Sequence, residues 1–151
     1  IINTLWEADV EVVSFLSKKF GKQCIVASID VKMNNQNIKE VYVNRGNRSV
    51  GCSAIQWAMF CEKNGAGEIF FNNINHDGNR KGYDLETISE ISKKVKIPLI
   101  AFGGVFSWKH VLEGLNAGAD AVAAANIFHY KEMAIKQAKR YLLRQNIKIR
   151  N

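Results

Sequence analysis

The sequence predicts an α/β fold built on a parallel sheet, and three observations lead to this prediction. Apolar segments typical of strands alternate with amphipathic segments typical of helices four times along the chain. The predicted strands are apolar along their whole length, which is typical of parallel strands covered on both faces. Neither a linker nor a low-complexity stretch divides the 151 residues, so we expect a single domain over residues 1–151.

The elements are expected in the following order. Residues 8–20 have helical spacing that ends at Gly21, and the apolar run CIVASID at 24–30 is typical of a buried strand. Residues 33–50 are polar around VYVN, which indicates a hairpin-like excursion. The rest alternates between helix and strand: a helix at 54–64 capped by Ser53, a strand at 68–74, a helix at 84–95 capped by Asp84, a strand at 98–104, a helix at 107–117 capped by Ser107, a strand at 120–126 and a final amphipathic helix at 130–145.

Composition restricts the class of protein. The chain is 47% hydrophobic and 23% charged, which is typical of a soluble globular domain and excludes a disordered chain. No apolar stretch is long enough for a membrane span, and the first residues lack the pattern of a signal peptide. The net charge of +7 favours anionic ligands, phosphates above all, but is too diffuse to indicate nucleic acid. The odd number of cysteines, in no zinc-binding pattern, favours a reducing cytoplasm and no metal site.

The candidate site lies where the predicted strands end, because ligands of parallel βα arrays bind at the carboxyl ends of the strands. The first strand ends at Asp30, which can act as a general acid or base, or can be a structural carboxylate paired with Lys32. The third strand ends in Gly103-Gly104 and the fourth in Ala125-Asn126, so their backbone N–H groups can face a phosphate. Taken alone, the two glycines, like Asp77-Gly78 after the second strand, are better explained as simple turns.

Four segments carry a resemblance to a known family. SIDVK (28–32), GAGEIFFNNINHDGNRKGYDLETI (65–88), IPLIAFGGV (97–105) and GADAVAAANIFHY (118–130) closely resemble the cyclase subunit of imidazole glycerol phosphate synthase, the HisF family. The resemblance implies a (β/α)8 TIM barrel, of which this chain resembles the C-terminal half, strands 5–8 with their helices. It also implies ammonia supplied by a HisH-like glutaminase subunit, and a substrate with a phosphate at each end.

The resemblance also implies roles for individual residues. Asp30 matches a catalytic aspartate that moves protons during cyclisation, and Glu68 matches a charged residue at the ammonia entrance on the opposite end of its strand. The phosphate-binding positions fall into two groups. Those of the second half of the barrel are Asp77, Gly78, Gly103, Gly104, Ala125 and Asn126, whereas Asn3 and Thr4 match part of the other phosphate site. No cofactor, metal, nucleic acid or membrane is expected to take part.

Three positions depart from the family pattern. Asn75 stands where the family usually has Asp, Asn79 where it has Thr, and Phe102 where it has Ser before the double glycine. These departures leave room for a function outside histidine biosynthesis. The segments AFGGVFSW and AAANIFHY are more similar to a branch of HisF-like proteins encoded in surface-polysaccharide gene clusters. Proteins of this branch are thought to supply ammonia for sugar amidation. An inactive phosphate-binding half-barrel is the remaining alternative.

The resemblance covers the second half of a barrel, and the sequence begins at Ile1 rather than Met. Four parallel strands curved for a barrel leave two unpaired edges, which proteins seldom tolerate. We therefore expect a fragment of a longer polypeptide. On its own it is expected to be inactive, and to pair with the missing half or to associate with itself.

Overall fold

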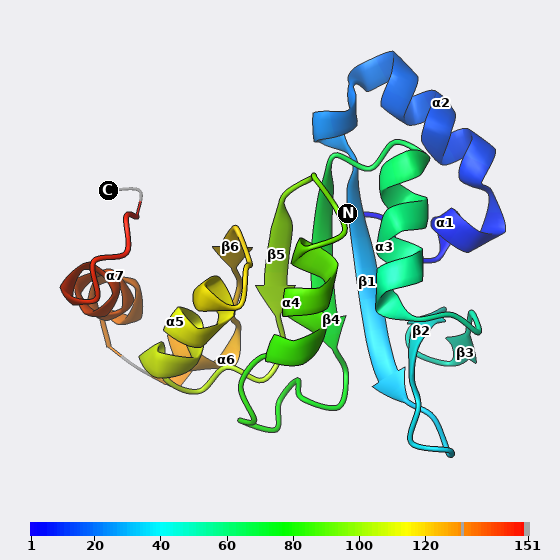
Figure 1. The fold of residues 1–151 in the computed structure, drawn as a ribbon. Coiled ribbons are helices and arrows are strands. Elements are labelled where there is room, and N and C mark those ends of the chain that lie inside the picture. The colour runs from blue at the N-terminus through cyan, green and yellow to red at the C-terminus, as the bar shows by residue number, and fades with distance from the viewer. Residues whose placement is uncertain (131, 150–151) are drawn as a thin grey trace.

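Over residues 1–130 and 132–149, a computed structural model contains a six-stranded sheet with helices packed against it (Figure 1). The strands are β1 (Val26–Met33), β2 (Lys39–Val43), β3 (Arg48–Ser49), β4 (Glu68–Asn73), β5 (Leu99–Phe102) and β6 (Ala121–Val122). The helices are α1 (Leu5–Ala8), α2 (Val10–Phe20), α3 (Ala54–Lys63), α4 (Leu85–Ser92), α5 (Trp108–Asn116), α6 (Asn126–Tyr130) and α7 (Ala134–Arg144), with a 3-10 turn at Lys22–Cys24.

The strands are ordered β3-β2-β1-β4-β5-β6 across the sheet. β1, β4, β5 and β6 are parallel, whereas β2 and β3 are antiparallel additions at one edge. The N-terminal segment extends the parallel part, because the Ile2 N–H donates to the Val26 carbonyl at 2.8 Å and the Ile2 carbonyl accepts from Ser28 N–H at 2.8 Å. The predicted parallel α/β fold and the hairpin excursion at 33–50 are therefore confirmed.

Local capping explains where the helices begin. The Ser53 hydroxyl accepts from the Gln56 N–H and the Gln56 side chain binds back to the Ser53 N–H, which forms a capping box. Asp84 and Ser107 cap α4 and α5, since their side chains accept from the Thr87 N–H and the His110 N–H, as the sequence predicts. Asp9 was expected inside the first helix. Its side chain instead accepts from Val12 N–H, so α2 begins after it and the short α1 precedes it.

One face of the sheet carries the hydrophobic core. Helices α3, α4 and α5 lie on the same side of the sheet (Figure 1). The strand side chains that point toward this layer are buried, and they are Ala27, Ile29, Val31, Ile69, Phe71, Leu99 and Ala101. They pack with Ala58 of α3 and with Ile88 and Ile91 of α4. This packing fixes the parallel strands in register and aligns their carboxyl ends.

The opposite face of the parallel strands is only half-buried. It carries Ser28, Asp30, Phe70, Asn72, Ile100 and Phe102, which alternate with the buried core positions. The expectation that both faces are covered is wrong for the described residues, since the helical layer covers one of them. This face combines apolar side chains with Ser28, Asp30 and Asn72, and the helices pack against the other face.

The last elements are shorter than the sequence predicts. The fourth parallel strand was expected over 120–126, but β6 spans Ala121–Val122 because Asn126 already begins α6. The final helix, expected over 130–145, begins at Ala134 after Met133 in a left-handed conformation with φ of 50°. The early part of that expected range includes residue 131, which lies outside the described residues. In the part of the chain that the structure describes, no helix is long and apolar enough to cross a membrane.

Candidate active site and phosphate pocket

The candidate residues gather where the parallel strands end, along the side of the sheet formed by their carboxyl ends, which we call the carboxyl edge. Asp30 of β1 pairs in register with Asn72 of β4, which in turn pairs with Phe102 of β5. These three residues form a row across the half-buried face. The loops that follow β4, β5 and β6 extend beyond this row at the same edge, because the three strands are parallel to β1.

Asp30 is held by side-chain amides on both sides. The Asn72 Nδ2 group donates to one carboxylate oxygen at 3.1 Å, and Asn3 Nδ2 donates to the other at 3.3 Å. Thr4 extends this chain, since its hydroxyl donates to Asn3 Oδ1 at 3.2 Å and accepts from the Asn44 N–H at 3.0 Å. The residues around Asp30 therefore orient the carboxylate without supplying a cation.

The alternative role of Asp30, a structural ion pair with Lys32, is not what the structure shows. The Lys32 ammonium lies over the Tyr42 ring, 5.4 Å from its centroid. Among the described residues, no cation lies within salt-bridge distance of Asp30. The sequence predicts a strand end at Asp30, but β1 continues to Met33, so Asp30 lies within the last half of the strand. A carboxylate without an ion-pair partner at this position is available for proton transfer.

The pKa of Asp30 is raised above its ordinary value. Burial is the main cause, because it disfavours the charged form, and the nearby negative charge of Asp77 adds to it. The hydrogen bond from Asn72 opposes the rise. This direction favours a general acid or base, since the group then holds and releases a proton closer to neutral pH.

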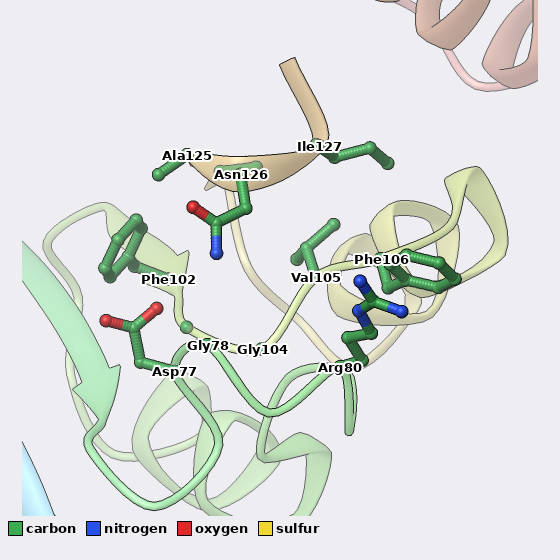
Figure 2. A pocket seen from close by; sticks show the side chains of 12 residues that line it. Asp77, Gly78, Arg80, Phe102, Gly104, Val105, Phe106, Ala125, Asn126 and Ile127 are labelled. Atoms are coloured by element: carbon green, nitrogen blue, oxygen red, sulfur yellow. The ribbon is translucent and has the colours of Figure 1, made fainter. Parts of the chain in front are cut away.

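Six predicted phosphate-binding residues line one pocket of about 350 Å³ beside this row (Figure 2). They come from the loop after β4, the loop after β5 and the start of α6, and they are Asp77, Gly78, Gly103, Gly104, Ala125 and Asn126. Residues predicted from three separate segments thus lie around the same cavity. Its volume falls in the range of small-molecule sites.

The backbone of this pocket has the features of an anion site. Gly103 and Gly104 have φ values of 95° and 87°, a left-handed conformation that favours glycine. A Cβ on Gly104 would meet the carbonyl oxygens of Gly82 and His76, so the tight approach of two loops also requires glycine there. Among the described residues, none accepts a backbone hydrogen bond from Gly103, Gly104 or Asn126. Their N–H groups remain available to a ligand.

The sequence analysis missed Arg80 in the pocket wall. Its guanidinium lies over the Phe106 ring, 4.4 Å from the centroid, and both side chains line the cavity (Figure 2). Arg80 also has a positive φ of 57°. Arg80 is the cationic side chain among the pocket-lining residues, and it offsets the negative charge that Asp77 contributes. The run DGNRKG has two adjacent cations, Arg80 and Lys81, and nothing in the sequence distinguishes the one that lines the pocket.

Two groups of predicted site residues lie elsewhere. Asn3 donates to Asp30, and Thr4 donates to Asn3. Neither residue lines the pocket. Glu68 is the first residue of β4 and pairs in register with Val26, the first residue of β1. It therefore lies at the amino ends of the parallel strands, opposite the carboxyl ends where the pocket lies. This placement is compatible with the implied entrance role but brings Glu68 into no contact with the pocket.

The departures at Asn75 and Asn79 have local structural roles. The Asn75 Oδ1 accepts from the Met33 N–H at 2.7 Å, which ties the loop after β4 to the end of β1. The Asn79 Nδ2 donates to the Asn75 carbonyl at 2.9 Å. Phe102 differs from both, because its ring lines the pocket itself. Within the described residues, no group of three His, Cys, Asp or Glu side chains can hold a metal.

The fold and site define an α/β protein whose mostly parallel sheet fits a (β/α)-barrel-type fold, with an acid and a glycine-lined pocket at one edge. A family model described as "Histidine biosynthesis protein" matches residues 1–134, and the chain belongs to this family. It is 41% identical over 149 residues to the imidazole glycerol phosphate synthase subunit HisF of Pyrobaculum aerophilum. That match covers 99% of this chain and 58% of the relative, and it confirms the predicted resemblance to HisF.

Proposed function

We propose that this chain forms the C-terminal half of a (β/α)8 barrel that acts as a cyclase subunit of the imidazole glycerol phosphate synthase type. The observation that carries this proposal is the common placement of Asp30 and the glycine-lined pocket at the carboxyl edge of the strands. In barrels of this type the catalytic groups lie at that edge. The family match and the similarity to HisF support the same reaction class.

In this proposal, the pocket binds one phosphate of a bis-phosphorylated aminoimidazole carboxamide ribotide intermediate. The free N–H groups of Gly103, Gly104 and Asn126 donate to phosphate oxygens, and Arg80 adds positive charge. Asp30 then moves protons during cyclisation, and Asn72 and Asn3 keep its carboxylate in a fixed orientation. Asn3 and Thr4 contribute to the second phosphate site.

Ammonia enters from the opposite edge in this proposal. Glu68 lies there, half-buried at the first residue of β4, where it can contact a glutaminase subunit that docks on the amino ends of the strands. The relative named above is a synthase subunit, which supports an assembly with a second subunit. We place the assembly in the cytoplasm, consistent with free cysteines at positions 24, 52 and 61.

Because the proposal makes this chain half of a barrel, the test supplies the other half together with it, and adds ammonia and the histidine-pathway intermediate. Asp30→Asn is expected to reduce kcat by about 10²–10⁴, the usual contribution of a general acid or base, with substrate affinity within a few-fold. Glu11→Gln on the exposed surface of α2 is the matched control and is expected to keep full activity. An Asp30→Asn enzyme that keeps its rate would remove Asp30 from the mechanism.

A second candidate is favoured by one observation, the phenylalanine at position 102 in the pocket wall. A bulky aromatic there changes the shape of the site, which fits a HisF-like component that uses ammonia for sugar amidation in polysaccharide synthesis. The same assay separates the two candidates. Binding of inorganic phosphate without turnover of the histidine intermediate would favour this second function or an inactive phosphate-binding module.

A further inference from the structure

Phe102 occupies the position between the phosphate pocket and Asp30. It is the last residue of β5 and pairs with Asn72, which pairs with Asp30. Neighbouring strands lie about 4.8 Å apart, so two strand spacings, about 10 Å, separate Phe102 from Asp30 along this row. A ligand that extends from the pocket along this row passes Phe102 and Asn72 before it reaches Asp30.

A second aromatic ring, on the neighbouring strand β4, packs against the Phe102 ring. This second ring is that of Phe70, and the two ring centroids lie 5.2 Å apart with an angle of 32° between the planes. Phe70 and Phe102 lie on the half-buried face, which the helices do not cover. The pair therefore presents an aromatic surface at the side of the pocket, and Figure 2 shows the Phe102 ring beside Asp77 and across from Asn126.

The pocket is also larger than an anion requires. Its volume of about 350 Å³ falls at the small end of sites that bind organic ligands, and a bare phosphate leaves most of it unfilled. Backbone N–H groups and Arg80 provide the polar part, whereas Phe102, Val105 and Ile127 provide an apolar part. The two parts match a ligand with a phosphoryl group at one end and an apolar or flat group next to it.

We propose that Phe102 is a specificity-determining residue that stacks against a flat heterocycle carried by a phosphate monoester bound in this pocket. Stacking of a flat ring on phenylalanine contributes to affinity and does not require hydrogen bonds in a fixed geometry. The stacked ring directs the rest of the ligand along the row toward Asn72 and Asp30. The inference rests on the proposed function, because it takes the pocket as the phosphate site.

The test measures binding by the full chain, by calorimetry, of three probes: inorganic phosphate, ribose 5-phosphate and adenosine 5′-monophosphate. The nucleotide is expected to bind about tenfold more tightly than ribose 5-phosphate, the scale of one base–aromatic stack. In Phe102→Leu this advantage is expected to disappear while the affinity for inorganic phosphate stays the same. Phe15→Leu, on the exposed surface of α2 and outside the pocket lining, is the matched control and should keep the nucleotide advantage.

Each outcome has a distinct meaning. If phosphate binds and the nucleotide has no advantage, or if the advantage survives Phe102→Leu, the role of Phe102 is overturned and the phosphate site stands. If none of the three probes binds, the phosphate site of the proposed function fails and the inference fails with it. Circular dichroism of Phe102→Leu checks that the variant is folded, and Phe102→Tyr, which keeps the ring, should restore the nucleotide advantage.

Discussion

Single residues at the carboxyl edge show how much chemistry depends on immediate neighbours. Asp30 was recognisable from the sequence because it ends the apolar run CIVASID, although β1 continues beyond it to Met33. Its pKa depends on groups far along the chain, since burial and Asp77 raise it and Asn72 lowers it. A carboxyl group with a raised pKa makes the folded state less stable as the pH rises through the interval above the ordinary value of 3.8. The raised pKa of Asp30 therefore costs stability at neutral pH.

Replacement of Asp77 tests this account. Asp77→Asn is expected to lower the pKa of Asp30, because it removes the nearby negative charge that favours the protonated form. The interval of pH over which stability falls should move toward 3.8 in the same variant. Carbon-13 NMR titration of the Asp30 carboxyl group measures the first effect, and denaturation at several pH values measures the second. A pKa that does not change would show that the two carboxylates are independent.

At the scale of elements, the hairpin and α4 are joined by one polar network around the buried Asp84 carboxylate. The Lys39 ammonium of β2 donates to Asp84 and to Glu86 at 3.0 Å each, and to the Thr87 hydroxyl at 3.3 Å. Asn73 at the end of β4 donates to the other Asp84 oxygen at 2.7 Å. The cap of α4 thus holds three elements together next to the loop that forms the pocket.

Removal of the Lys39 ammonium is expected to destabilise the fold. Lys39→Met should lower the free energy of unfolding by about 1–3 kcal/mol, since it leaves the buried Asp84 carboxylate without its cation. Burial alone raises the pKa of Asp84, but the bonds from Lys39 and Asn73 outweigh it and hold the pKa below 3.8.

The native protein should therefore keep the stabilisation from Asp84 above pH 3.8 and lose it as the pH falls through the lowered pKa. Lys39→Met should show little of this acid dependence. Denaturation between pH 2 and 7 measures both effects, and Lys32→Met on the adjacent strand, whose ammonium lies over Tyr42, is the control. Equal stabilities of the two variants would contradict the role of the network.

At the scale of the whole molecule, the sequence predicts what depends on local patterns. The alternation of strands and helices and the caps at Ser53, Asp84 and Ser107 follow from periodicity and side-chain chemistry over a few residues. The common edge of the candidate residues follows from the parallel order. The Arg80–Phe106 contact and the Lys39 network could not be predicted, because each joins loops or strands whose pairing is set by tertiary packing.

The half-buried face leads to a prediction for the isolated chain. It exposes part of Phe70, Ile100 and Phe102 without a covering layer of helices, so the chain is expected to associate in solution. Light scattering should give a mass above the 17.0 kDa of one chain. Ile100→Thr should weaken the association, whereas Ile38→Thr on the exposed turn of the hairpin should not. A monomer at all concentrations would contradict this prediction.

The contact between the two loops of the pocket has a consequence for how such a site can diversify. The Gly82 N–H donates to the Gly104 carbonyl at 2.8 Å, and no side chain fits between these loops. The backbone that would bind a phosphoryl group is therefore held in place by contacts between main-chain atoms, and the surrounding side chains take no part in these contacts. Substitutions of the surrounding side chains can then change which ligand binds, while the backbone contacts to the phosphoryl group stay the same.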